Sequence, residues 1–149
     1  MMRKISVVLL CVVALGACRK REERLVSKEN AADIPREVAI QKLQELLPTA
    51  ESVSCTMPKD SYKASEVKEW GVRPDGLRIA PVREKDALFT VSFADITQVR
   101  LDKVGRYFQV RLFAKPQPDA TKDLISFTWK TEEAPTRVVE LIESLRLKK

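Results

Sequence analysis

The chain has 149 residues, with 27 Lys or Arg against 21 Asp or Glu, and its formal net charge is +6. This length suits one ordinary domain, and charges of both signs alternate along the chain, which argues against a nucleic-acid-binding surface. Histidine is absent and the four glycines are not clustered. The composition therefore excludes Ser–His and Cys–His nucleophile pairs, histidine metal ligands and phosphate-binding glycine loops, and we expect no metal or cofactor.

The first eighteen residues, MMRKISVVLLCVVALGAC, have the build of a secretory signal. Arg3 and Lys4 precede an apolar run that is too short to span a membrane, and small residues follow it. The ending, Leu15-Gly16-Ala17-Cys18, resembles the lipobox of bacterial lipoproteins. The resemblance implies cleavage before Cys18 and attachment of diacylglycerol to its thiol. The alternatives are an ordinary cleaved signal and a buried element of the fold, which the charged residues after Cys18 disfavour.

On this interpretation the chain has three parts: a signal peptide at residues 1–17, a tether at 18–32 and a single domain at 33–149. The tether is polar, and its basic residues either lie against anionic headgroups or follow the bias of any exposed linker. Arg19 replaces the aspartate that favours inner-membrane retention in lipoproteins, so the resemblance favours the outer membrane, facing the periplasm. Cys55 is then the single free cysteine, and no intramolecular disulfide can form.

The first predicted helix covers about residues 35–47. Asp33 is a candidate N-cap, Pro35 suits the first turn, and Pro48 ends the helix. Apolar residues recur at helical spacing along it: Ala39, Ile40, Leu43, Leu46 and Leu47. After the helix, alternation around Val53 and Cys55 predicts a short strand with Cys55 inward, and residues 58–61 read as a turn.

From residue 67 onward, apolar and polar side chains alternate strictly, which predicts antiparallel strands with one buried face. The turn Pro74-Asp75-Gly76 between two such runs predicts a hairpin, and residues 103–106 predict another. A closing helix is predicted at about 132–147, with Thr131 as N-cap. Its apolar stripe is Val138, Leu141, Ile142 and Leu145.

The order of elements predicts an α+β fold: an N-terminal helix, six or seven antiparallel strands in a bent sheet or partial barrel, and a C-terminal amphipathic helix. Residues 67–147 resemble the layout of pleckstrin-homology-like domains, in which a C-terminal helix plugs one mouth of a bent sheet. A curved sheet wrapped on one long helix is the alternative.

The function that we favour from the sequence is a non-catalytic binding or adaptor domain of the cell envelope, which contacts a protein or an anionic glycan or lipid headgroup. Outward basic residues on neighbouring strands, together with two aromatic side chains, form the candidate contact surface. It comprises Arg100, Arg106, Tyr107, Arg111 and Phe113, with Arg78 and Lys130 as possible neighbours. In the alternative interpretation the arginines are a solvated face, and the N-terminal helix covers both aromatics.

Two further functions are considered. A barrel lined by aromatic side chains could carry an apolar or lipid ligand, although such side chains commonly fill small barrels; they are Phe89, Phe93, Phe108, Phe127 and Trp129. A carboxylate-based hydrolase is the least favoured, because no spacing singles out a catalytic pair. We expect Asp95 and Asp102 to lie at strand ends, where they cap turns.

Overall fold

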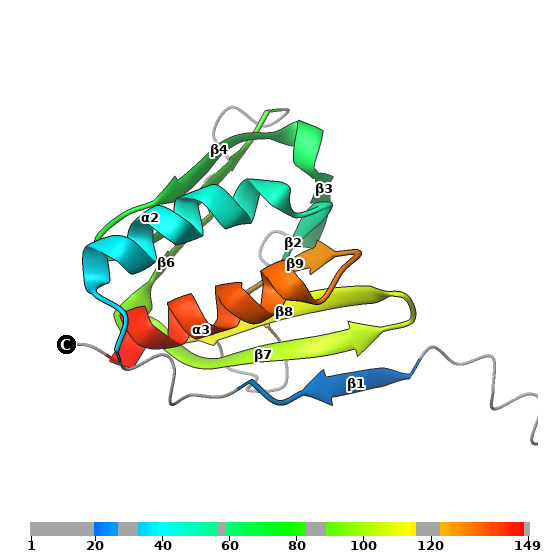
Figure 1. The fold of residues 1–149 in the computed structure, drawn as a ribbon. Coiled ribbons are helices and arrows are strands. Elements are labelled where there is room, and N and C mark those ends of the chain that lie inside the picture. Colours follow the sequence, from blue (N-terminus) through cyan, green and yellow to red (C-terminus); the bar gives the residue numbers. More distant parts are fainter. Residues whose placement is uncertain (1–19, 27–32, 57–58, 83–88, 116–122, 148–149) are drawn as a thin grey trace, which may run out of the picture.

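The computed structural model describes residues 20–26, 33–56, 59–82, 89–115 and 123–147 (Figure 1). It has two α-helices, α2 (Arg36–Leu46) and α3 (Glu133–Leu147). Three short 3-10 turns, η2 (Leu47–Thr49), η3 (Ala64–Glu66) and η4 (Phe93–Asp95), connect other elements. The described strands are β1 (Arg21–Arg24), β2 (Ser52–Thr56), β3 (Lys59–Lys63), β4 (Val67–Val72), β5 (Gly76–Pro81), β6 (Phe89–Ser92), β7 (Ile96–Val104), β8 (Tyr107–Ala114) and β9 (Ile125–Trp129).

The strands form two antiparallel sheets. The larger has six strands in the order β1-β7-β8-β9-β2-β3, and the smaller has three in the order β4-β5-β6. Three separate segments of the chain build the larger sheet. The strands β7, β8 and β9 form one side-by-side block, β2 and β3 pair beside β9, and β1 pairs with β7 at the opposite edge. The described strands therefore make two sheets and no closed barrel, whereas the sequence predicts a single bent sheet or partial barrel.

Two positions in the sheets and their turns require glycine. In the β7–β8 hairpin, Val104 pairs with Tyr107, and the two-residue loop begins with Gly105 at φ 61°. This left-handed conformation strains residues with a Cβ, and two-residue hairpin loops favour glycine there. At the start of β5, a Cβ on Gly76 would lie 2.2 Å from the carbonyl oxygen of Val91 on β6. Glycine at residue 76 thus allows β5 and β6 to approach each other.

The two helices lie in the space between the sheets (Figure 1). Helix α3 packs on the inner face of β7, β8 and β9, and α2 packs against α3 and β4. Arg36, at the start of α2, donates hydrogen bonds to the carbonyl oxygens of Pro74 and Leu145. These bonds tie the start of α2 to the end of α3 and to the β4–β5 turn.

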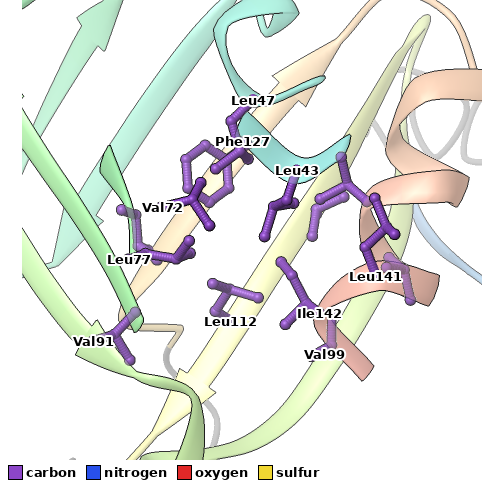
Figure 2. Packing of buried hydrophobic residues seen from close by; sticks show 14 of the residues in the cluster. Leu43, Leu47, Val72, Leu77, Val91, Val99, Leu112, Phe127, Leu141 and Ile142 are labelled. Atoms are coloured by element: carbon purple, nitrogen blue, oxygen red, sulfur yellow. The ribbon is translucent and has the colours of Figure 1, made fainter. Parts of the chain in front are cut away.

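The core lies where the helices meet both sheets (Figure 2). Leu43 of α2, Ile142 of α3 and Leu112 of β8 are all fully buried and lie near one another in the view. Val72 and Leu77 reach the same core from the smaller sheet, and Phe127 from β9. Apolar side chains at helical spacing on the helices and at alternate positions on the strands thus pack into the same core.

Both predicted helices are confirmed, and so are the β4–β5 and β7–β8 hairpins. The predicted cap at Asp33 is wrong, because Pro35 occupies the N-cap position of α2 and no side chain caps the helix. The turn predicted at residues 58–61 is wrong at residues 59–61, which belong to β3, and Lys59 pairs with Thr56 of β2. Residue 58 lies outside the described residues. The stretch predicted as a tether contains β1, whose four residues pair with β7.

Truncation of Leu43 tests the core. Leu43→Ala removes a fully buried side chain between α2 and α3, and we expect the free energy of unfolding to fall by about 2–5 kcal/mol. Val38→Ala on the same helix is the matched control, because Val38 is 39% exposed; its expected change is within about 0.5 kcal/mol. Urea denaturation measures both, and equal losses would contradict the packing described.

Candidate functional site

The outer face of the larger sheet, away from the helices, carries the polar residues that the sequence singles out. Register places Arg100 of β7 directly opposite Arg111 of β8, and Asp102 opposite both Gln109 of β8 and Glu23 of β1. Alternation sends Val99 and Leu101 inward, where they are buried, and these polar neighbours outward. Two arginines that face each other across a ladder repel unless an anion lies between them.

Asp102 supplies that anion. Its side chain is completely buried, and Oδ1 accepts a hydrogen bond from Arg100 while Oδ2 accepts one from Arg111, each at 3.2 Å. The guanidinium of Arg21 on β1 lies 3.7 Å from Oδ2. A buried carboxylate is costly to desolvate, and these cationic donors on both sides offset that cost.

Arg111 extends the cluster away from β1. One terminal nitrogen donates a hydrogen bond of 3.3 Å to Oδ1 of Asp123, and Nε lies 3.3 Å from Oδ2 in ionic contact. The same guanidinium lies 5.0 Å from the ring centroid of Phe113, and that of Arg100 lies 6.0 Å from it. Phe113 therefore packs under two cations and is only 4% exposed.

We call this group the Asp102 cluster. It consists of three arginines and three carboxylates: Arg21, Arg100, Arg111, Glu23, Asp102 and Asp123. Its formal charges cancel, and its groups are paired with one another. The cluster thus joins β1, β7 and β8 to Asp123, just before β9. Each of its three carboxylates contacts at least one arginine.

The five predicted contact residues fall in two places. Arg100, Arg111 and Phe113 lie within or against the Asp102 cluster, and Arg111 and Phe113 are buried. Arg106 and Tyr107 lie at the β7–β8 turn, where the Arg106 guanidinium is 5.3 Å from the Tyr107 ring centroid and 3.2 Å from its hydroxyl. Helix α2 packs on the other side of the sheet, so it does not cover the two aromatics.

Other predicted residues lie apart from this face. Arg78 is on the smaller sheet, 3.6 Å from Glu69, and Lys130 lies 3.5 Å from Glu51. Cys55 is buried, facing inward as predicted. The proposed lipid attachment at Cys18 falls outside the described residues.

Asp102 is the residue that the sequence interpretation misplaces. It was expected at a strand end as a turn cap, but it lies within β7 as the centre of an ion cluster. The available signal was the predicted hairpin itself, since its register sets Arg100 against Arg111 and an outward acid two residues away compensates both.

The aromatic side chains expected to line a ligand pocket are part of the packed core. Phe93, Phe127 and Trp129 are each at most 3% exposed, and the Phe127 ring centroid lies 6.3 Å from those of Trp70 and Trp129. Two cavities bordered by described residues lie at the margins of the fold. One, of about 250 Å³, lies between β1, β7 and α3, and the other, of about 500 Å³, lies beside the β4–β5 turn, η4 and Lys115. Charged side chains contribute to both linings.

Within the described ranges, no three acidic or cysteine side chains are grouped so that they could hold a metal ion. Neither of the two described α-helices is long and apolar enough to cross a membrane. Comparison of the chain with protein-family models, with curated proteins and with solved structures finds no match in any of the three.

Neutralising Asp102 tests the cluster. Asp102→Asn keeps the shape of the side chain but leaves Arg111 buried beside a neutral group, and we expect a loss of about 3–5 kcal/mol in the free energy of unfolding. Glu69→Gln, which breaks the half-exposed pair with Arg78, is the control and should cost less than about 1 kcal/mol. Urea denaturation compares the two.

A second change separates charge from shape. If the Asp102→Asn loss comes from repulsion between Arg100 and Arg111 once the anion between them is gone, adding Arg111→Gln should recover part of it. A double variant no more stable than Asp102→Asn alone would contradict that origin.

Proposed function

We propose that this protein is a lipoprotein of the bacterial cell envelope, anchored by lipid on Cys18, whose remaining domain acts as a non-catalytic binding or adaptor module. The observation that carries the proposal is Leu15-Gly16-Ala17-Cys18 directly after a basic and then apolar leader. Arg19 after the cysteine favours the outer membrane, with the domain facing the periplasm. The partners that fit are an envelope protein or an anionic glycan or lipid headgroup.

Binding is favoured over catalysis by the state of the polar groups on the outer face. The Asp102 cluster pairs its carboxylates with arginines, so these acids are engaged in holding strands together. Arg106, in contrast, is exposed at the tip of the β7–β8 hairpin beside the amphipathic ring of Tyr107. Arginine and tyrosine are enriched at contact surfaces. Arg106 and Tyr107 are therefore the part of the predicted contact surface that a partner can reach.

We also propose that the layout of the domain resembles that of pleckstrin-homology-like domains. Three consecutive strands in each of two antiparallel sheets, β4-β5-β6 and β7-β8-β9, followed by α3 against the inner face, support it. The hairpin β2–β3 and the strand β1 are additions to that layout.

Intact mass of the membrane-extracted protein tests the anchor. We expect a chain that begins at Cys18 and carries the added mass of diacylglyceryl and acyl groups, recovered with the membrane. Cys18→Ala should lose that mass and its membrane recovery, because the thiol that bears the lipid is gone.

Cys11→Ala is the matched control, since it removes a cysteine from the same leader and leaves Cys18 in place. It should retain the lipid. An unmodified wild-type chain, or the same loss in both variants, would contradict the proposal.

A further inference from the structure

The register of β1 places the start of the described chain beside the β7–β8 turn. Arg21 is paired with Val104, and Gly105 and Arg106 follow immediately as the turn. In Figure 1, β1 begins on the same side of the molecule as that turn. The described chain therefore begins beside the tip of the longest hairpin.

Covalent geometry limits how far the proposed lipid can lie from this tip. Cys18 is three residues before Arg21, so their Cα atoms are at most about 11 Å apart. Adding the spacing of two paired strands, Cys18 lies within about 16 Å of Val104. A lipid on Cys18 thus brings the β7–β8 turn close to the headgroups whenever β1 is paired.

The same tip carries cationic side chains, three of which form no ion pair among the described residues. Lys103 lies 5.8 Å from the ring centroid of Phe108, and Arg106 stacks on Tyr107. Within the described ranges, neither forms an ion pair, and neither does Lys20. Arg21 contacts Asp102, yet its side chain remains 42% exposed.

The acids at this end are fewer than its basic residues. Glu22 and Glu132 share Arg24, each 3.6 Å from it, and Glu51 lies 3.5 Å from Lys130. Glu22 also lies opposite Lys103 in the β1–β7 ladder. Glu133, at the start of α3, is an acid without such a partner in the described part of the chain. The local charge therefore stays positive.

We propose that the end of the domain formed by Lys20, Arg21, Lys103, Arg106 and Tyr107, here called the basic end, rests on anionic phospholipid headgroups of the membrane that holds the lipid on Cys18. The inference rests on the lipid anchor proposed above, and it adds a second, electrostatic contact that fixes orientation. Basic side chains near an anionic surface attract it, and a tyrosine ring suits the headgroup level.

The opposite end of the domain then faces the aqueous compartment. The β4–β5 turn lies there, because Arg36 joins Pro74 of that turn to Leu145 near the end of α3, whereas α3 begins beside the basic end. The cavity of about 500 Å³ lined by Arg73, Asp75 and Lys115 lies at this far end. A soluble partner could reach it while the basic end stays on the membrane.

Amide hydrogen exchange on the lipidated, full-length mature protein in vesicles tests the contact. We expect slower exchange at residues 103–107 in vesicles that contain phosphatidylglycerol than in vesicles of phosphatidylcholine alone. The β4–β5 turn, residues 73–76, is the internal control and should exchange equally in both. Equal exchange at 103–107 in both vesicles, or equal slowing of both turns, would overturn the proposal.

Charge removal provides the matched pair of variants. Lys103→Gln with Arg106→Gln should lower the equilibrium constant for contact between the basic end and the anionic surface by roughly 30-fold. Each basic residue near such a surface contributes about 1 kcal/mol of attraction. Arg73→Gln with Lys115→Gln removes two charges from the far end and should leave the protection at 103–107 unchanged. Protection that survives the first pair, or is lost in the second, would contradict the inference.

The two proposals fail separately. A chain that carries lipid on Cys18 but shows no protection at residues 103–107 contradicts the basic-end contact and leaves the anchor standing. A chain that lacks the lipid contradicts the anchor and, with it, the geometry on which this contact depends.

Discussion

The pairing of β7 with β8 is the constraint on which both faces of the larger sheet depend. It sets Val99 opposite Leu112 and Leu101 opposite Val110 on the face that α3 covers. On the other face the same register sets Arg100 opposite Arg111, with Asp102 between their guanidinium groups. A slip of one residue would turn the apolar set outward and bury the charges against α3, so packing and electrostatics select the same register.

The Asp102 cluster also explains how β1 stays on the sheet. The sequence of β1, Arg-Glu-Glu-Arg, contributes no apolar side chain, and three of its four residues are exposed. Arg21 contacts Asp102 and Glu23 contacts Arg100, at 3.7 and 3.5 Å. Backbone pairing and these ionic contacts, and not the burial of apolar side chains, therefore hold β1 on the sheet. Its charged edge also discourages pairing with another chain.

The sequence predicts the parts of the fold that have a clear period. The helices α2 and α3 follow from apolar residues at helical spacing, and the β4–β5 hairpin follows from alternation around Pro74-Asp75-Gly76. The strand β1 escapes prediction because four charged residues have no apolar period. The strand β3 escapes it because Pro58-Lys59-Asp60-Ser61 has turn-forming composition, which pairing with β2 overrides.

The sequence predicts which face of the sheet carries the candidate site, but it does not predict the acidic partners of the arginines there. Alternation assigns Arg100, Arg111 and Phe113 to one face, but it cannot show that acids from β7 and from residue 123 neutralise that face. Those partners come from chain segments far apart in sequence, and tertiary structure brings them together. Arg106 and Tyr107 remain accessible at the turn, which shifts the proposed contact surface from the middle of the sheet to its end.

The pairing of β1 with β7 is the central claim, because it links the Cys18 end of the chain to the β7–β8 turn. A double variant, Arg21→Cys with Val104→Cys, places two thiols on directly paired residues, within reach of a disulfide. Mild oxidation of the membrane-bound protein should cross-link this pair, as mass spectrometry of the digested chain would show. Arg21→Cys with Arg100→Cys, four residues out of register, should not cross-link. Absence of the first cross-link, or equal formation of both, would contradict the account.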